Sequence, residues 1–379
     1  MKTLVAPSTT LETPPELSAT EPPEERGLER DGVRLLVAEP GGLHHAHFRD
    51  LSRFLRPGDL VVVNTSATFA AAVEGTRRGD SAVVVHFSTP SDDQTWVVEL
   101  RASDGSGPIL DGEVGELIGL PGGVALTLLS PRTDPRVPGG VRLWQAKIST
   151  RSSVEDYLAR HGRPITYGYA RGRWDLAAYQ TVFAREAGSA EMPGAGRPFT
   201  NELVTELIAK GVVLAPVLLH AGVSSLEAKE LPAAERFRVP EQTAGLVNHT
   251  RRSGGRVIAV GTTVTRALET VARPDGSVTA GEGSTELVLG PTRPARAIDG
   301  IISGWHPPGA SHLLLLEAVA GTRLVRQAYA GARAAGYLWH EFGDSSLLLP
   351  ERRSRLRAAR QRGRSIQHGV PDQPRGDLS

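Results

Sequence analysis

The stretch GRVIAVGTTVTRALE, residues 255–269, indicates the fold class of this chain. Its β-branched run, Val257–Val260, is typical of a short strand that is buried on both faces of a parallel sheet. Gly261 then permits a sharp bend, and the hydroxyl of Thr262 or Thr263 is expected to cap the helix that follows. A buried strand that leads at once into a helix is the unit from which α/β folds are built.

The predicted helix presents polar side chains that suit an anionic ligand. Thr262, Arg266 and Glu269 stand at i, i+4 and i+7, which places them on one helical face. The first turn of a helix at the carboxyl end of a strand attracts anions, and Arg266 lies one turn inside it. These residues leave two interpretations open, a ligand site or an ordinary surface pair of Arg266 with Glu269.

Composition narrows the class of protein. A chain of 379 residues is long enough for two domains, and its 40% hydrophobic and 22% charged residues are typical of a soluble globular protein. Lys plus Arg (43) nearly balances Asp plus Glu (42), so any RNA partner must be met by a local patch rather than by a global basic field. Because the sequence has no cysteine, disulfides, thiolate nucleophiles and Cys-ligated metals are excluded.

Targeting signals are also missing from the sequence. Residues 1–10 hold one lysine and no apolar core of a signal peptide, and the aliphatic run Leu313–Leu316 is too short to span a bilayer. We therefore expect a cytoplasmic protein without a membrane partner.

The pattern along the chain predicts a barrel-like α/β domain with an inserted all-β domain. Residues 69–147 contain short apolar runs separated by Gly, Pro, Ser and Asp, which is typical of closely spaced strands. Residues 1–68 and 148–350 form the predicted α/β domain. The arginine-rich residues 351–379 form a basic tail that we expect to be disordered. Strands are predicted at 33–38, 60–63, 212–219, 257–260 and 287–289, and helices at 48–55, 176–186, 201–210, 243–253, 264–271 and 311–335.

Histidines are the first candidates for proton transfer near neutral pH, and His306 lies in a loop just before an apolar, predicted helix. His306 follows Trp305, whose flat ring suits a base, and two prolines and a glycine restrict the loop. His220 ends a predicted strand beside Gly222, where α/β proteins collect their sites. A structural role remains open for both histidines. The sequence shows no HxxxH or HExxH spacing and no phosphate-loop signature, so we predict neither a metal site nor a standard nucleotide fold.

An ordered series of segments resembles the S-adenosylmethionine:tRNA ribosyltransferase-isomerase family of queuosine biosynthesis. The resemblance covers most of residues 12–349 and is most specific at Val257–Glu269. Its other parts are Pro14–Leu17, Arg34–Val37, Phe48–Leu51, Leu55–Asp59, Val63–Asn64, Tyr179–Ala184, Ala195–Gly196, Phe199–Thr200, Asp299, His306, Pro308, Ala318–Gly321, Gly336–Tyr337 and Gly343–Asp344.

The resemblance implies a reaction and a set of site residues. The ribosyl group of S-adenosylmethionine, as co-substrate and without a further cofactor, is transferred to 7-aminomethyl-7-deazaguanine in tRNA, which gives epoxyqueuosine and releases adenine and methionine. Such a site needs a base, a proton donor and anchors for charged groups. The candidates are His306, His220, Glu235 and Asp344 for catalysis, and Thr262, Thr263, Arg266, Glu269, Trp305 and Asn64 for substrate binding.

The sequence also departs from the family pattern. After Asn64 the family has Asp-Thr-Arg and later Pro-Ala-Arg, whereas this chain has Thr65–Ala67 and Ala70–Ala72. Arg197–Pro198 replaces Leu-His, and of Met-His-Ser-Glu only Glu235 is kept. The lost arginines leave two alternatives open, an S-adenosylmethionine enzyme with a different acceptor and a non-catalytic nucleotide- or RNA-binding relative. A monomer or weak oligomer is expected.

Overall fold

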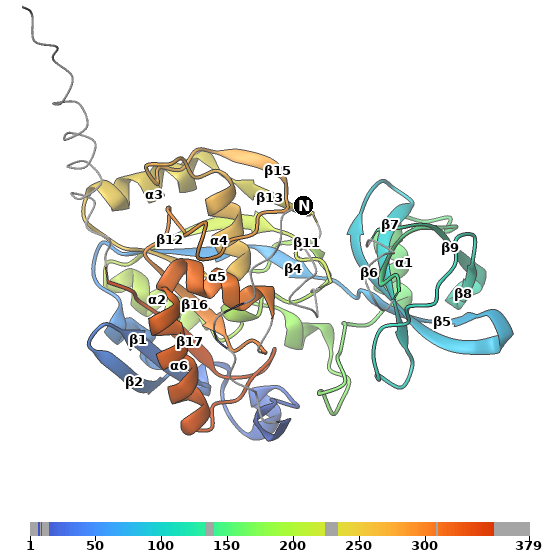
Figure 1. Ribbon diagram of the computed structural model, residues 1–379, viewed down its shortest axis with the longest axis horizontal. Coiled ribbons are helices and arrows are strands. Elements are labelled where there is room, and N and C mark those ends of the chain that lie inside the picture. Colours follow the sequence, from blue (N-terminus) through green and yellow to red (C-terminus); the bar gives the residue numbers. More distant parts are fainter. Residues whose placement is uncertain are drawn as a thin grey trace, which may run out of the picture.

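A computed structural model describes residues 7, 9, 15–132, 140–223, 234–307 and 310–351 of the chain. Two bodies lie side by side, a larger α/β body and a smaller β barrel, and a narrow connection joins them (Figure 1). The predicted basic tail from Arg352 onward and the family proline at Pro308 lie outside the described residues.

The α/β body is built on one large mixed sheet. Parallel pairing joins β12 to β3, β3 to β14 and β14 to β16, which forms the central block of the sheet. Strands β13 and β17 flank this block as its antiparallel neighbours. The order across the whole sheet is β15-β13-β12-β3-β14-β16-β17-β1-β2. The strands are β1 (Arg34–Glu39), β2 (Gly42–His47), β3 (Leu60–Asn64), β12 (Val213–Leu219), β13 (Glu235–Val239), β14 (Val257–Val260), β15 (Gly281–Thr285), β16 (Gly300–Gly304) and β17 (Ser345–Leu348).

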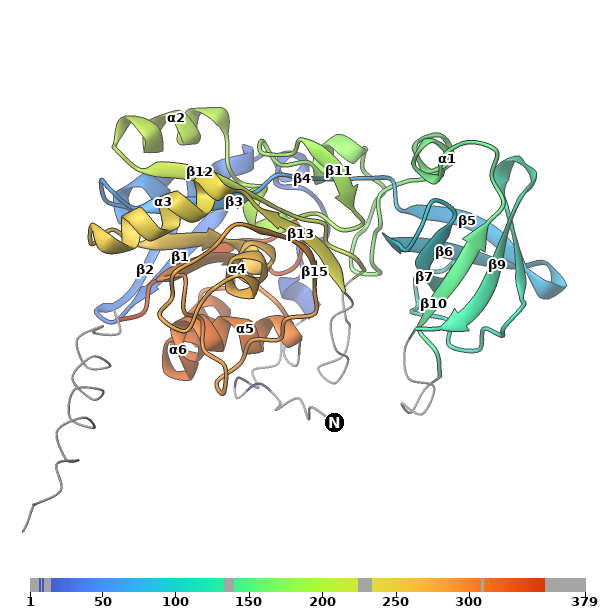
Figure 2. The same cartoon turned by 90° about the horizontal axis from the view of Figure 1, so that it is seen from above.

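Helices cover both faces of this sheet, because its central strands are apolar on both sides. Leu60, Val62 and Ala259 pack against α3 to α6, whereas Val61 and Ile258 pack against α2 and the 3-10 helix η4. Figure 2 shows α2 and the pair α5–α6 on opposite sides of the sheet. The helices are α1 (Val154–His161), α2 (Asn201–Ala209), α3 (Glu241–Arg252), α4 (Gly261–Thr270), α5 (Ser311–Ala320) and α6 (Thr322–Ala334). The 3-10 helices are η1 (Pro15–Leu17), η2 (Pro23–Arg26), η3 (Arg30–Gly32), η4 (Phe48–Phe54), η5 (Arg78–Asp80), η6 (Pro121–Gly123), η7 (Leu176–Tyr179) and η8 (Gly194–Gly196).

The smaller body is a closed barrel in the order β10-β7-β6-β5-β8-β9. Alternate residues of its strands point inward, and α1 packs into the same core through Val154, Tyr157 and Leu158. The predicted boundary at residue 148 stays a prediction, and the packing of α1 favours a later one. The barrel strands are β5 (Ala72–Arg77), β6 (Ser81–Pro90), β7 (Thr95–Ala102), β8 (Leu117–Leu120), β9 (Val124–Pro131) and β10 (Leu143–Ile148), and the short pair β4 (Ser66–Thr68) and β11 (Glu186–Ser189) lies between the two bodies.

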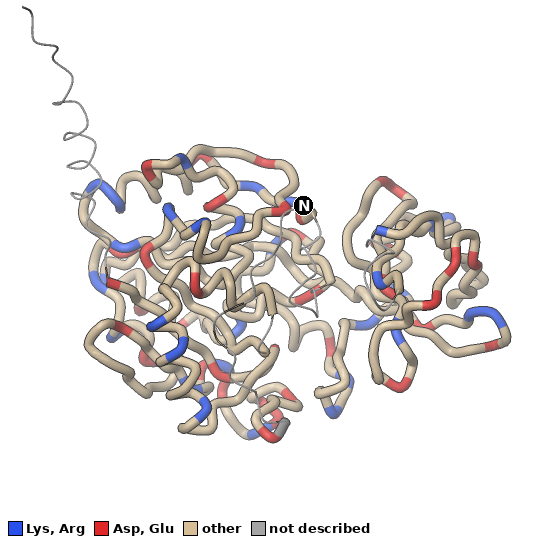
Figure 3. Tube along the Cα trace, viewed as in Figure 1, with Lys and Arg blue, Asp and Glu red and all other residues tan. Residues whose placement is uncertain are grey.

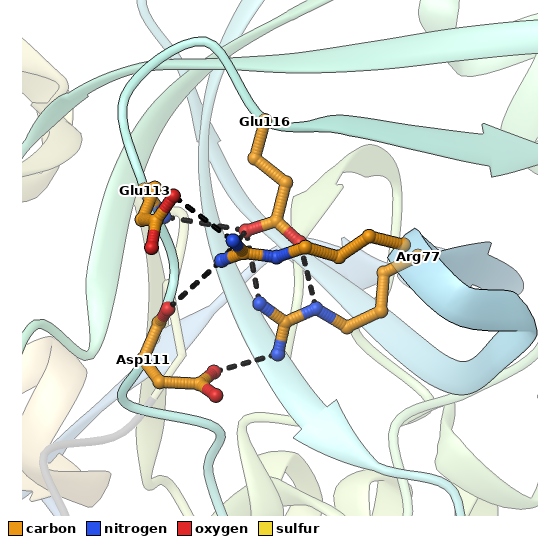
Figure 4. A network of polar contacts seen from close by, with 5 residues as sticks. Arg77, Asp111, Glu113 and Glu116 are labelled. Carbon is orange, nitrogen blue, oxygen red and sulfur yellow. Dashed lines mark hydrogen bonds and ion pairs between the residues drawn. The ribbon is translucent and has the colours of Figure 1, made fainter.

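A polar network closes the barrel surface beside β8 (Figure 4). Arg77 donates to both carboxylate oxygens of Glu116, at 2.7 and 2.9 Å, and to Asp111 at 2.6 Å. Its neighbour Arg78 donates to Glu113 at 2.9 Å. Bidentate pairing of this kind fixes the guanidinium and the carboxylate in one relative geometry, so the network connects the segment before β8 to strand β5.

The predicted fold class, an α/β body with an inserted all-β module, is confirmed. The α/β body, predicted to be barrel-like, is instead an open sheet whose outer strands, β15 and β2, do not pair with each other, and the closed barrel is the inserted module. Lysines and arginines are interspersed with acidic residues over both bodies (Figure 3), as the balanced composition predicts. No helix in the described part of the chain has the length and apolarity needed to cross a bilayer.

Several predicted elements differ from the structure. The predicted strand 287–289 is not a strand, although Leu287 and Leu289 are buried in the core. The predicted helix 176–186 is only the 3-10 turn η7 followed by β11, and the predicted helix 311–335 is two helices that separate at Gly321. In each case the apolar pattern does not fix the local geometry of the segment.

Candidate active site

Four central strands of the large sheet have their carboxyl ends on the same side of the body. We call this row of strand ends the site edge, which is distinct from the edge strands. It is defined by Asn64, Leu219, Val260 and Gly304, the last residues of β3, β12, β14 and β16. Because these strands run parallel, the loops that follow them meet there, which is where open α/β sheets form their sites. The structure thereby brings together most of the predicted site residues.

Helix α4 starts without the predicted cap. Gly261 has a φ of +92° and is itself the first helical residue, so the chain turns within one residue after β14. The N-cap is Val260, whose side chain cannot accept a hydrogen bond, and the prediction that Thr262 or Thr263 caps the helix is wrong. Both threonines lie instead in the first turn, partly exposed at the site edge.

Asn64 orients this first turn. Its side-chain nitrogen donates to the Leu219 carbonyl at 2.8 Å and to Thr263 Oγ1 at 3.3 Å. Its side-chain oxygen accepts from the backbone N–H groups of Leu219 and Ser66. The amide is therefore occupied by the protein, and Asn64 joins β3, β12 and α4 rather than offering free donors.

Arg266 lies in the second turn of α4 with its guanidinium largely enclosed. Its Nη2 pairs with Glu235 Oε2, while Glu235 Oε1 accepts from the Gly222 N–H at 3.1 Å. Its Nη1 is buried and has no partner among the described residues. Burial lowers the pKa of Arg266 to about 10, so the group stays cationic at neutral pH. A buried, charged donor without an acceptor is suited to a ligand carboxylate or phosphate.

Glu269 faces away from this cation. Its carboxylate accepts from the backbone N–H groups of Arg296 and Ala297, at 2.8 and 2.7 Å, and only 3% of the residue is exposed. Arg266 pairs with Glu235 instead, so the two residues do not form the surface pair that their spacing suggests. The structure leaves Glu269 outside the group of side chains at the site edge.

His220 is held from two sides. Its Nδ1 lies 2.8 Å from Ser66 Oγ, and Ser66 Oγ lies 2.6 Å from Ser189 Oγ. A Cβ at Gly188 would come within 2.4 Å of His220 Nδ1, so only glycine fits there. Burial lowers the pKa of His220, with Arg236 and Arg238 adding to the effect against Glu186. His220 is therefore neutral at neutral pH.

His306 stacks on a histidine that the sequence reasoning missed. The rings of His306 and His312 lie parallel within 6°, with centroids 4.4 Å apart. Burial, then His312 and His340, lowers the pKa of His306 well below its usual range, and burial together with Arg266 lowers that of His312 to about 4. The influence of Arg266 on His312 links this pair to the arginine of α4.

Trp305 and Asp344 serve the structure of the body. Trp305 is 1% exposed and packs edge-on against Tyr329, so it offers no open face to a base. The Asp344 carboxylate accepts from the backbone and guanidinium of Arg34 and from the Leu338 N–H. It thereby ties the start of β1 to the loop before β17.

A second group that sequence reasoning missed lies beside His306. Tyr169 and His340 stack with centroids 4.0 Å apart, and His340 has a φ of +74°, which is unusual outside glycine. Burial, and then Glu191, raises the pKa of Glu341 to about 8, although Tyr169 donates to it.

A surface hollow of about 320 Å³ adjoins His220 and is lined by Glu186, Leu218, Arg236, Phe237, Arg238, Glu282, Gly283 and Ser284. Within the described ranges no three His, Asp or Glu side chains are grouped as metal ligands.

Comparisons with known proteins show what this chain is similar to. The family model described as queuosine biosynthesis protein matches residues 9–348. The S-adenosylmethionine:tRNA ribosyltransferase-isomerase of Geobacter sulfurreducens is 35% identical over 351 residues, which are 89% of this chain and 97% of that protein. The enzymes of the same name from Moorella thermoacetica and Acidiphilium cryptum are 34% and 36% identical, covering 89% and 88% of this chain and 98% and 96% of their own. The crystal structure of S-adenosylmethionine tRNA ribosyltransferase from Thermotoga maritima, at 27% identity, covers 90% of this chain and 99% of its own with a TM-score of 0.49. With one family model spanning nearly all of the described residues and relatives above 30% identity along their whole length, this chain belongs to the queuosine biosynthesis protein family.

Proposed function

We propose that this chain is an S-adenosylmethionine:tRNA ribosyltransferase-isomerase, the activity for which its relatives are named. It transfers the ribosyl group of S-adenosylmethionine to 7-aminomethyl-7-deazaguanine in tRNA, and it forms epoxyqueuosine, adenine and methionine. Family membership over residues 9–348 supports the reaction. The observation that carries our assignment of the site is Nη1 of Arg266, which is buried at the site edge and has no partner in the described part of the chain.

The charges at the site edge suggest a role for each group. Arg266, oriented by Glu235, binds an anionic group of the substrate such as the methionine carboxylate. His306 and His220 are both neutral near neutral pH, so each is able to accept a proton from substrate. Thr262 and Thr263 present hydroxyls in the first turn of α4, beside Arg266.

The reaction as proposed uses S-adenosylmethionine as co-substrate and no further cofactor. The acceptor is a tRNA, so we also propose that the protein works in the cytoplasm. Turnover that persists after treatment with a chelator is the expected result for a reaction without a metal.

The test of this function is turnover by the purified protein. The protein is incubated with S-adenosylmethionine and tRNA that carries the deazaguanine precursor, and adenine release and nucleoside mass are followed. Adenine release together with the epoxyqueuosine mass supports the proposal. Adenine release without a mass change on tRNA contradicts it and favours a different acceptor.

The role of Arg266 is tested separately by binding. Arg266→Gln removes the enclosed cation, and we expect the Kd for S-adenosylmethionine to rise by at least about tenfold, since a charge-assisted hydrogen bond from Nη1 is lost. The control is Arg53→Gln, because the Arg53 side chain is 72% exposed on η4. If calorimetry gives the same Kd for wild type and Arg266→Gln, Arg266 does not bind this substrate.

A further inference from the structure

The parallel stack of His306 and His312 places one imidazole against another at the site edge. His306 belongs to the loop after β16, and His312 belongs to the first turn of α5. Their centroids are 4.4 Å apart and their planes differ by 6°. A ring that lies flat on another ring is prevented from turning about its last side-chain bond, so the position of His312 limits the orientation of His306.

Ser303 sets which ring nitrogen of His306 faces the protein. Its Oγ lies 3.0 Å from His306 Nε2. Ser303 is 1% exposed, and its carbonyl accepts from Ser346 Oγ at 3.0 Å, so its own position is held by β17. With Nε2 directed to Ser303, Nδ1 is the ring nitrogen left for a ligand, and the residue as a whole is partly exposed at the site edge.

The groups around His306 are mostly basic, so they disfavour protonation of its ring. His312 faces it from α5, and His340 faces it from the loop before β17. Tyr329 on α6 accepts from the His306 backbone N–H at 3.3 Å. Arg266 on α4 adds a cation beside His312. Protonating either stacked ring would place a positive charge beside another basic group in a poorly solvated site, so the two imidazoles favour a neutral pair.

We propose that His312 is a positioning residue for His306. By stacking, it holds the His306 ring in one orientation, with Nε2 on Ser303 and Nδ1 toward the substrate. This inference rests on the proposed function, in which His306 handles a proton of the substrate. It adds a residue of α5 that the reasoning from sequence did not select.

Two substitutions at one position separate stacking from the other properties of His312. His312→Phe keeps a flat ring and fills the same space without a titratable nitrogen, whereas His312→Leu removes the ring. The matched control is His161→Leu in α1, because His161 also packs on an aromatic ring, Tyr157, at 4.8 Å but belongs to the barrel. Thermal melting of each variant reports its folding.

Nuclear magnetic resonance of the imidazole nitrogens measures the orientation without any turnover. The full-length protein is labelled at the histidine nitrogens, and His306→Gln assigns the His306 signals. We expect wild type and His312→Phe to show one tautomer of His306 with its pKa far below the usual range. We expect His312→Leu to show exchange between tautomers.

Turnover then reports whether the orientation matters for the reaction. We expect His312→Phe to keep kcat within about threefold of wild type, and His312→Leu to lose at least about tenfold in kcat with KM for S-adenosylmethionine nearly unchanged. A wild-type kcat in His312→Leu overturns the inference. An equal loss of kcat in His312→Phe and His312→Leu also overturns it, since the ring alone would then be insufficient. If wild type releases no adenine, the proposed function fails, while the resonance measurement still tests the stack.

Discussion

Replacing Glu269 tests whether this residue supports the fold or binds substrate. In the structure its carboxylate accepts a buried backbone N–H, that of Ala297, at 2.7 Å and a partly buried one, that of Arg296, at 2.8 Å. Glu269→Ala leaves the buried Ala297 N–H without an acceptor, which costs about 2 kcal/mol, and removes the partly buried bond to Arg296, which is worth about 1 kcal/mol, so we expect the free energy of unfolding to fall by about 3 kcal/mol. Glu269→Gln keeps one acceptor oxygen and loses the charge, so we expect a loss of about 2 kcal/mol.

Urea unfolding followed by far-ultraviolet circular dichroism measures these losses, and calorimetry measures the Kd for S-adenosylmethionine. The control is Glu286→Ala, an exposed acid in the same region, for which we expect a change within about 0.5 kcal/mol. We expect the Kd of the Glu269 variants to stay within about threefold of wild type, because the carboxylate does not face Arg266. A stable Glu269→Ala protein that binds S-adenosylmethionine about tenfold more weakly would refute this reasoning and return Glu269 to the substrate site.

Two further predictions concern the barrel and the start of the sheet. Although burial raises it, the neighbouring His86 and the charge of Arg142 bring the pKa of Glu99 down to about 2, so the contribution of this carboxylate to stability is present above the unfolded value of 4.5 and is lost as pH falls from there toward 2. Acid unfolding of the wild type followed against Glu99→Gln checks this, and an identical pH dependence of the two proteins would contradict it. Asp344→Asn weakens the ion pair with Arg34, and we expect it to lower the free energy of unfolding by about 2 kcal/mol while kcat stays within about threefold. A kcat loss at unchanged stability would instead make Asp344 a catalytic group.

The strand and helix at residues 257–269 were predictable from sequence because local and global signals agree there. A β-branched run buried on both faces leaves little choice but a central strand, and β14 has the predicted bounds Val257–Val260. The cap was mispredicted because Gly261 turns the chain within a single residue, and no pattern of side chains reports a φ of +92°. The segment 287–289 was mispredicted as a strand for a related reason, because burial alone does not distinguish a strand from a packed loop.

The site was predictable in its location but not in its contacts. A predicted strand end identified His220, since parallel strands bring their carboxyl ends together, and a loop restricted by prolines before a predicted helix identified His306. Whether a side chain then faces the ligand depends on tertiary packing, so Trp305 is enclosed by other aromatic rings although its loop suggested exposure. His312 and His340 escaped notice because they meet His306 from other elements, and no spacing along the chain encodes that approach.

The pairing of β1 with β17 has a consequence for the order in which the chain acquires its structure. Leu35 pairs with Ser345, so the first long strand of the sheet finds this neighbour only when nearly all of the chain has been synthesised. The barrel strands, by contrast, come from the single stretch 72–148, and each pairs with strands of that same stretch. Because contiguous domains fold as units while the chain emerges from the ribosome, the barrel is the part that folds first, and the α/β body closes around its site last.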